Sequence, residues 1–383
     1  MTDDAMHDSY GRPLAELQLE QSAFRLRRQL AERLFHGGQI TDPEWRRAFG
    51  WVPRHDFAPA FWAPDATGEL QRVERGEPGW LETVYSDQAL ITQMTDGIAT
   101  SSSTGPGLMA VMLEALSVRD GNRVKEIATG TGYNAALLSE RLGADRVTTV
   151  EVDPELAALA DRRLHQAGYA PRVVIGDGRQ PQGGRTGYDR TIVTCGMDSI
   201  PYALVEETRP GGIIVSPLGG GIVRLVVDHD GTAEGRFLPQ PSYFMAARQP
   251  GQTGMAPHPG RPADPRHSTS RVAAVEWASN EMLHFLASLF APGMSWSTEH
   301  EPETGAVRAT ELWAADGSWA RVDGVDVQQS GPRHLWDAVE AACDGWEAAD
   351  TPGRDAFGVT VDKDGQRLWI EDGNNPFPAG GAR

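Results

Sequence analysis

The stretch KEIATGTGYN, residues 125–134, decides how the rest of the chain is interpreted. Its first residues continue a β-rich run, and the residues after Gly132 are compatible with a helix, so the glycines lie in a strand-to-helix turn. Gly130 and Gly132 stand where a nucleotide-binding turn needs glycine, because the backbone must approach the ligand at a helix N-terminus. The earlier loop position, where glycine is usual, holds Ala128.

Two interpretations of this turn compete at first. The segment GTGYNA (130–135) satisfies the dinucleotide pattern G-x-G-x-x-A, and Glu151 lies at about the distance expected of an acid that binds ribose. These residues alone would support an NAD-dependent oxidoreductase. A tight turn that binds no ligand is the plain structural alternative.

Three acidic residues shift the balance between these interpretations. Glu126 stands inside the strand before the turn, Glu151 ends the next predicted strand, and Asp177 follows the third in GDG, 176–178. Carboxylates at consecutive strand ends suit ribose hydroxyls and an exocyclic amine, and they do not suit a pyrophosphate. The pattern therefore favours S-adenosylmethionine, a cationic nucleoside, over NAD.

The chain around the turn alternates between short β-rich runs and helix-compatible stretches. Such alternation predicts βαβ units on a parallel sheet that is covered by helices on both faces. The predicted strands are 123–127, 146–152, 172–176, 188–194 and 211–218, and the predicted helices are 133–142, 154–167 and 200–209. Residues 221–238 predict antiparallel strands that turn at Asp230-Gly231 and close the edge of the sheet.

The two ends of the chain have other patterns. Residues 14–36 have apolar residues at helical spacing, and a second helix is expected from TDPEW (41–45), with Thr41 as N-cap and Glu44 completing a capping box. Residues 51–80 lack a clear period and predict an irregular connection. The predicted domains are a helical N-terminal extension (1–80), a methyltransferase-type domain (81–248), a Pro/Gly-rich connection (249–268) and a C-terminal α+β domain (269–383).

The C-terminal region predicts helices at NEMLHFLASLF and HLWDAVEAACDGW, and hairpins that turn at 316–317 and 364–365. In the second helix Trp336, Val339, Cys343 and Trp346 share one stripe, so we expect the tryptophans to be core residues.

The composition excludes several classes of protein. The chain has 383 residues and a net charge of −18, which argues against a nucleic-acid partner. Two cysteines fit a reducing cytoplasm, and the histidines lack ligand spacing, so we predict a cytoplasmic protein without a metal. No apolar run reaches membrane-spanning length, so no membrane association is expected.

Residues 84–245 resemble the protein-L-isoaspartate O-methyltransferases. The resemblance rests on an ordered series of segments: VYSDQALIT, SSSTGPGLMAVMLEAL, VKEIATGTGYNAALLSERLG, VTTVEVDPELAALADRRL, GDG, YDRTIVTCGMDSIPYALVEETRPGGIIVSPLG and RFLP. WVPRHDF (51–57) resembles the segment that approaches this domain in the family. The resemblance implies an α/β, Rossmann-like S-adenosylmethionine-dependent methyltransferase fold, with the helical N-terminal extension and the C-terminal α+β domain added to it.

The long ends resemble a narrower group, the actinobacterial methyltransferases encoded beside ATP-grasp ligases in graspetide (omega-ester peptide) clusters. The segments ITDPEWRRAFGWVPRHDF, TGTGYNAALL, GRFLP, YFMAAR and the tryptophan-rich tail carry this resemblance. It implies that the partner is a macrocyclic precursor peptide whose aspartate is methylated and then closes to an aspartimide. General repair of isoaspartyl proteins is the alternative within the same enzyme class, and a peptide-binding chaperone with a vestigial pocket is a non-enzymatic one.

The family resemblance also implies a set of site residues. Aligning the prolines of SSSTGP with the family's T-I-S-x-P-like segment places Thr104 on the serine that orients the acceptor carboxylate, with Ser103 beside it. The expected cofactor-binding residues are Ser102, Ser103, Glu126, Ala128, Thr129, Gly130, Gly132, Tyr133, Asn134, Glu151, Val152, Asp177, Gly178 and Thr194. Tyr85, Asp87 and Cys195 are further candidates for substrate contact. Asp87 has the equal alternative of capping a turn, and Cys195 that of an inert thiol.

Two expectations concern chemistry. A peptide aspartate has a pKa near ~4, so the acceptor is already an anion at neutral pH and needs no base. The methyl group of Ala128 is expected to narrow the space beside the methionine part of the cofactor without preventing its binding. The oligomeric state does not follow from the sequence.

Overall fold

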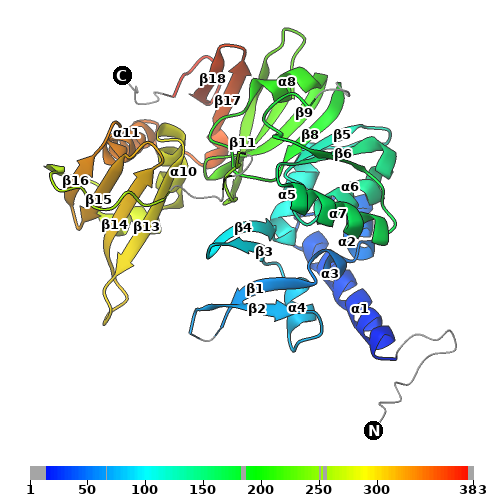
Figure 1. The fold of residues 1–383 in the computed structure, drawn as a ribbon. Helices are drawn as coiled ribbons and strands as arrows, with labels where there is room; N and C mark the ends of the chain where they lie inside the picture. Colours follow the sequence, from blue (N-terminus) through cyan, green and yellow to red (C-terminus); the bar gives the residue numbers. More distant parts are fainter. Residues whose placement is uncertain (1–13, 66, 183–186, 250–251, 253–256, 378–383) are drawn as a thin grey trace. The chain divides into compact units, whose positions relative to one another are not determined.

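The structure, a computed structural model, describes residues 14–65, 67–182, 187–249, 252 and 257–377. Contacts divide the chain into two compact units, Met1–Gly178 with Gln249–Gly251 and Arg179–Arg248 with Gln252–Arg383. Figure 1 shows the elements of both units. This division splits the predicted segment 81–248 after Gly178, and the predicted domain boundaries stay predictions.

The glycine turn belongs to the first unit and leads from a parallel sheet into a helix. Strands β5 (Val124–Ile127), β6 (Val147–Glu151) and β7 (Arg172–Ile175) pair in parallel in that order. Helix α6 (Tyr133–Leu142) follows β5, and α7 (Pro154–Gln166) follows β6. The predicted strands and helices of this region are confirmed to within two residues, because buried β-rich runs and capped amphipathic helices leave clear local patterns.

The remaining helices of the first unit lie before the turn in sequence. They are α1 (Leu14–His36), α2 (Pro43–Trp51), α3 (Arg54–Phe57), α4 (Trp80–Val84) and α5 (Pro106–Leu116), with a 3₁₀ turn η1 (Ala144–Arg146) after α6. α2 packs on α1 and on α6. The helix predicted at 14–36 is confirmed, because α1 covers Leu14–His36.

The capping prediction for α2 was wrong by one residue. Asp42 is the N-cap, and its carboxylate accepts from the N–H of Glu44 at 2.8 Å. Pro43 follows at the first helical position, which suits its fixed φ. Thr41 instead donates its N–H and its hydroxyl to Glu114 of α5, both at 2.8 Å, a contact that the local sequence does not reveal.

The irregular connection predicted for residues 51–80 was also wrong. This region contains strands β1 (Ala60–Pro64) and β2 (Leu70–Glu74), which join β3 (Leu90–Thr95) and β4 (Ile98–Ser103) in an antiparallel sheet of order β2-β1-β3-β4. β1 and β2 show no strict alternation of buried and exposed residues, so the period-2 signal was absent. β4 ends at Ser103, directly before Thr104.

The second unit begins with the rest of the α/β pattern. β8 (Tyr188–Val193) pairs in parallel with β9 (Thr208–Leu218), and α8 (Tyr202–Glu207) lies between them in sequence. β10 (Gly221–Val227) and β11 (Ala233–Pro241) continue the sheet antiparallel, as predicted. The hairpin of β17 (Phe357–Asp362) and β18 (Gly365–Ile370) pairs with β11, so the end of the C-terminal region adds to this sheet.

The rest of the second unit forms a smaller α+β structure. Its five-stranded antiparallel sheet has the order β12-β16-β15-β14-β13. The strands are β12 (Arg266–Thr269), β13 (Met294–His300), β14 (Val307–Ala314), β15 (Trp319–Asp323) and β16 (Asp326–Ser330), and the helices are α9 (Ala274–Ser279), α10 (Glu281–Phe290) and α11 (Leu335–Ala348), with a 3₁₀ turn η2 (Arg354–Ala356) before β17. Trp277 and Trp336 are fully buried in the core between them, and Trp346 packs against it. The expectation that the tryptophans are core residues is confirmed for these positions.

An ionic network lies on this smaller sheet around Arg321 of β15. The guanidinium group, only 8% exposed, donates to both carboxylate oxygens of Glu299 at 2.8 and 2.7 Å, and to Glu311 at 3.0 Å. Arg261 and His258 donate to Glu311 from the Pro-rich connection. The hydrogen bond from Arg321 lowers the pKa of Glu299 below its ordinary value of 4.5. Burial opposes the same change at Glu311, but its three hydrogen bonds prevail and lower its pKa as well.

We expect Arg321→Met to lower the free energy of unfolding by about 2–3 kcal/mol at pH 7, because it leaves Glu311 short of a charged partner. Both carboxyls have lowered pKa values in the folded state, so their stabilisation is present above pH 4.5 and is lost as the pH falls through the folded pKa values. The difference in the free energy of unfolding between wild type and Arg321→Met should therefore become smaller below pH 4.5. Urea unfolding at several pH values measures it.

The matched control is Arg367→Met on β18, which removes an ion pair between a guanidinium that is 62% exposed and Asp362 of β17. Exposed pairs contribute about 0–1 kcal/mol, so this variant should unfold close to wild type. If both variants lost the same amount of unfolding free energy, burial of the Arg321 network would contribute nothing to stability.

Candidate functional site

The backbone of the glycine turn is held in left-handed conformations. Gly130 has φ 54° and Gly132, the N-cap of α6, has φ 89°. A Cβ atom added at Gly132 would lie 3.3 Å from Leu164 and 3.4 Å from Ala160 of α7. Glycine at 132 is therefore required twice, by the turn and by the approach of α7.

Ala128 also has a left-handed backbone, with φ 72°. Its N–H donates to the carbonyl of Val150 at 2.9 Å, so this conformation is fixed by the pairing between the ends of β5 and β6. A left-handed backbone costs a residue with a Cβ about 1–2 kcal/mol. The alanine therefore strains the backbone of the turn. The sequence analysis considered only the volume of its methyl group and did not include this strain.

Glu151 ties the turn to the end of β6. Its side chain accepts from the N–H of Gly130 at 2.9 Å and from the N–H of Asp153 at 3.2 Å, and the residue is 4% exposed. Asp153 in turn caps α7 through the N–H groups of Glu155 and Leu156. The predicted ribose-binding acid thus stands beside the turn, as its place at the strand end required.

Glu126 has a different position from that of Glu151. It is completely buried and accepts hydrogen bonds from Asn134 at 2.7 Å and from Thr149 at 2.6 Å. Burial raises the pKa of its carboxyl to about 7, although the two hydrogen bonds act in the opposite direction. Glu126 therefore holds the first turn of α6 against β6 from within, and it shares this network with Thr129, whose hydroxyl lies 2.6 Å from that of Thr149.

The other predicted cofactor residues surround the same strand ends. The N–H of Gly176 donates to the carbonyl of Glu151 at 2.8 Å, which places GDG next to β6. A Cβ at Gly178 would come within 2.5 Å of Ile127, so the chain passes close to β5 here. Asp177 and Val152 are half-buried, and Tyr133 packs its ring against Phe49 and Phe57.

The serine-rich end of β4 lies against the glycine turn. A Cβ at Gly130 would meet the hydroxyl of Ser101 and the carbonyl of Ser102, each at 3.7 Å. Ser103 is buried, and Thr104 is half-buried. Within the described residues, the hydroxyl of Thr104 makes no hydrogen bond, whereas that of Ser103 accepts from Arg54 at 3.4 Å. The structure thus brings together the two segments that the sequence analysis singled out.

The three candidates for substrate contact differ in position and exposure. Asp87 accepts from the N–H of Gly107 at 2.6 Å at the start of α5, the capping alternative, while its residue remains exposed. Tyr85 is buried and its hydroxyl lies 2.6 Å from His55, a position that does not favour substrate contact. His55 is buried, and its ring nitrogens lie within hydrogen-bond distance of Tyr85 and Glu20. Thr194 and Cys195 follow β8 in the second unit, and Cys195 is half-buried and forms no disulfide within the described part of the chain.

Two residues of the site were missed by the sequence analysis. The hydroxyl of Ser101 would lie 3.7 Å from a Cβ atom at Gly130. Arg54 donates to the carbonyls of Gln88 and Thr104. Arg54 lies in WVPRHDF, which was noted only as an approach segment. His55 and Asp56 directly follow it, so the local sequence contains no signal that marks this arginine as buried.

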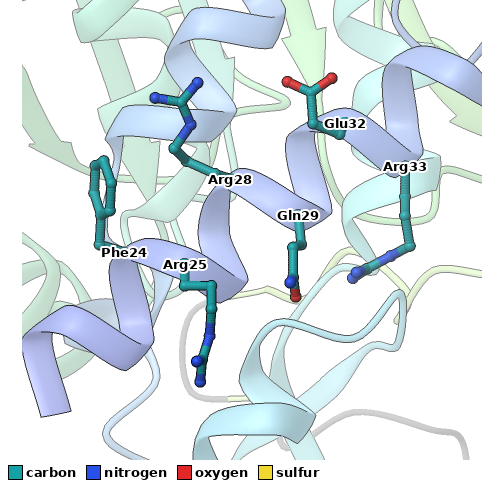
Figure 2. Close-up of a pocket in the computed structure, with 6 residues that line it drawn as sticks. All are labelled: Phe24, Arg25, Arg28, Gln29, Glu32 and Arg33. Carbon is teal, nitrogen blue, oxygen red and sulfur yellow. The ribbon is translucent and has the colours of Figure 1, made fainter. Parts of the chain in front are cut away.

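A surface hollow of about 700 Å³ lies elsewhere in the first unit, along α1 (Figure 2). Its lining residues are Phe24, Arg25, Arg28, Gln29, Glu32 and Arg33. None of them is a predicted site residue, and Glu32 and Arg33 are already bonded to Arg46 and to the carbonyl of Tyr85. The hollow is an open helix face and not the candidate site.

The donor set at the strand ends fits S-adenosylmethionine. Glu151 ends β6 and Asp177 follows β7, and their carboxylates suit hydroxyl groups and an amine, whereas Glu126 is enclosed inside the unit. Glycines at the turn keep side chains away from a ligand at the N-terminus of α6. Among the described residues, no group of three His, Cys, Asp or Glu side chains could hold a metal ion. No helix of the described chain is long and apolar enough to span a bilayer.

We expect Ala128→Gly to raise the free energy of unfolding by about 1 kcal/mol, because glycine relieves the left-handed strain and loses only part of the gain to chain entropy. The matched control is Ala158→Gly at an exposed position of the right-handed helix α7, which should lower the same quantity by about 1 kcal/mol. Chemical unfolding measures both. A loss of stability in both variants would contradict the assignment of strain to Ala128.

The chain was compared with protein families and curated relatives. Residues 25–238 match the family described as Protein-L-isoaspartate(D-aspartate) O-methyltransferase (PCMT). The protein-L-isoaspartate O-methyltransferase of Methanopyrus kandleri is 34% identical over 198 residues, covering 51% of this chain and 77% of the relative. That of Hyperthermus butylicus is 33% identical over 224 residues, covering 55% and 83%.

The solved structures show the fold. A structure described as a protein-L-isoaspartate O-methyltransferase superimposes with a TM-score of 0.54 at 20% identity, covering 90% of this chain and 100% of that chain. The fold is the Rossmann-like fold of S-adenosylmethionine-dependent methyltransferases, and the cofactor is S-adenosylmethionine. The family match thus decides between the dinucleotide and the methyl-donor interpretations of GTGYNA. With its glycine turn, its strand-end carboxylates and its serine-rich loop in one unit, this chain belongs to the protein-L-isoaspartate O-methyltransferase family.

Proposed function

We propose that this protein transfers a methyl group to the free carboxylate of an isoaspartyl residue in a peptide or protein. The observation that carries the proposal is the contact between the serine-rich end of β4 and the glycine turn; next to it, the hydroxyl of Thr104 makes no hydrogen bond to any part of the chain that the structure describes. The family match and the names of the curated relatives support the same acceptor class.

The residues of the first unit supply binding and orientation. Glu151 and Asp177 would hold the ribose hydroxyls and the adenine amine of S-adenosylmethionine, and the turn at Gly130 would lie along its amino-acid part. When bound, the cofactor supplies an electrophilic methyl group. The chain then has to bring a carboxylate into line with that group and keep water away, which is catalysis by proximity and orientation.

The acceptor needs orientation more than activation. A peptide carboxylate with a pKa near ~4 is ionised at neutral pH, so no proton has to be removed before transfer. An unbonded hydroxyl at Thr104 can donate to one carboxylate oxygen and leave the other free to accept the methyl group. Glu126 does not serve as a base here, because Asn134 and Thr149 enclose its carboxylate.

A second candidate acceptor is an aspartate in a ligase-cyclised ribosomal peptide. Its support is the resemblance of the segments outside the core of the domain, together with Ala128 and Thr104, where this chain departs from the family pattern. After methylation, a backbone amide nitrogen would attack the ester, methanol would leave, and an aspartimide would form. The C-terminal region does not by itself favour this acceptor, because an isoaspartate methyltransferase structure superimposes over 90% of the chain.

The two acceptors predict different products. We expect a linear isoaspartyl peptide to gain one methyl group in the presence of S-adenosylmethionine, and the same peptide with ordinary aspartate to gain none, measured by mass spectrometry. An ester-cyclised aspartyl peptide serves as the competing substrate. Preferential methylation of the cyclised peptide would replace the repair proposal by the second candidate, and methylation of none of the three would contradict both.

Thr104→Ala should lower kcat/KM for the preferred peptide about 10- to 100-fold, because a hydrogen bond to a charged group contributes about 1.5–3 kcal/mol. Thr104→Ser keeps the hydroxyl and should stay close to wild type. Thr67→Ala, which removes an exposed hydroxyl bonded to Asp65, is the matched control and should not change kcat/KM. Full activity in Thr104→Ala would assign the orienting role to another group.

A further inference from the structure

Arg54 is a buried arginine. Its guanidinium group binds the main chain of two segments, residues 84–88 and residues 103–104. It lies in α3, and none of its surface is exposed. One nitrogen donates to the carbonyls of Val84 at 2.7 Å and Ser86 at 3.2 Å. The other donates to the carbonyls of Gln88, Ser103 and Thr104 at 3.0, 3.3 and 3.1 Å.

The two bound segments contain Asp87 and Thr104, which the family resemblance implies for the substrate site. Residues 84–88 contain Asp87, whose carboxylate accepts from Gly107 at the start of α5. Residues 103–107 contain Thr104, so Arg54 and Asp87 each join the same two segments. Arg33 of α1 adds a bond to the carbonyl of Tyr85 at 2.8 Å. We call residues 84–88 and 103–107 together the acceptor cradle.

Burial of this cation is costly unless its hydrogen bonds are satisfied. Burial lowers the pKa of Arg54 to about 10, while the nearby charge of Asp87 acts in the opposite direction. Its hydrogen-bond partners among the described residues are five carbonyls and the hydroxyl of Ser103, with no carboxylate among them. A lysine could not reproduce this arrangement, because an ammonium group has three donors and no planar fork.

We propose, on the basis of the isoaspartyl methyltransferase function above, that Arg54 is the positioning residue of the acceptor site. It joins residues 84–88 to residues 103–104 and thereby sets where the Thr104 hydroxyl meets the acceptor carboxylate. It does not touch the reacting atoms. Its hydrogen bonds all reach the acceptor cradle, and its contact with the turn segment is limited to the ring of Tyr133, 5.9 Å away. We therefore expect its loss to act on acceptor binding and orientation more than on cofactor binding.

A purely structural role for Arg54 would have another signature. The second unit offers a matched control in Arg354, which is 5% exposed and donates to the carbonyl of Pro239 at 3.0 Å. Burial lowers its pKa too. Arg354→Lys therefore imposes a similar change on a buried guanidinium that is bonded to main chain, outside the acceptor cradle.

The experiment compares Arg54→Lys and Arg354→Lys in the full chain. In Arg54→Lys, we expect KM for the isoaspartyl peptide to rise and kcat to fall, with a combined loss of about 10- to 100-fold, since small misplacements can cost about 10²-fold. The dissociation constant of S-adenosylhomocysteine, measured by calorimetry, should stay within about twofold of wild type. Amide hydrogen exchange should become faster in the acceptor cradle of this variant, and Arg354→Lys should keep wild-type kinetics and exchange there.

Unchanged exchange in the acceptor cradle of Arg54→Lys would overturn the proposal, as would a parallel loss of S-adenosylhomocysteine binding. Should this variant not fold, Arg54→Gln, which buries a neutral amide, is measured in the same way. The exchange measurement needs no substrate. It therefore tests Arg54 even if wild type methylates no isoaspartyl peptide, an outcome that would contradict the proposed function alone.

Discussion

The left-handed backbone of the turn between β5 and α6 is the constraint on which the site depends. Ala128, Gly130 and Gly132 all have positive φ, and together they reverse the chain so that α6 starts directly beyond the end of the strand. The carboxylate of Glu151 accepts from Gly130 and so holds this turn at the end of β6. Without these conformations, the helix N-terminus and the strand-end carboxylates would not converge.

Two carboxylates near this turn have opposite roles because their surroundings differ. Glu126 is enclosed by hydroxyl and amide donors inside the unit, where burial raises its pKa to about 7. Glu151 stands at the strand end and bonds main-chain N–H groups of the turn and of the segment that starts α7. Glu126 therefore supports the packing inside the unit, and Glu151 holds the main chain at the strand end, where the sequence predicts a ribose-binding acid. Their places along the strands explain the difference. Glu126 lies inside β5, four residues before Gly130, whereas Glu151 is the last residue of β6.

The acceptor side of the site is organised by hydrogen bonds between segments that are distant in sequence. Arg54 binds carbonyls up to 50 residues away along the chain, and Asp87 caps a helix 20 residues away. These bonds join the end of the sheet formed by β1 to β4 to the start of α5. The positions of Ser103 and Thr104 thus result from the antiparallel sheet as much as from the methyltransferase core.

Much of the core could be predicted from local patterns. β5 to β11, α6, α7 and the C-terminal hairpins follow runs whose period, caps and turn residues are readable in the sequence, and the glycine turn with its acids predicted the cofactor class. The sequence failed at 51–80, where the strands lack alternation, and at the cap of α2, where Glu114 competes for Thr41.

By itself, the sequence determined the α/β pattern and the glycine turn, because these depend on residues close together in the chain, and it favoured S-adenosylmethionine over a dinucleotide. Only the tertiary structure decided that Ala128 is strained, that Glu126 is enclosed and that Arg54 binds both segments of the acceptor cradle. Each of these depends on backbone conformation or on a hydrogen bond between distant segments, which no local pattern encodes.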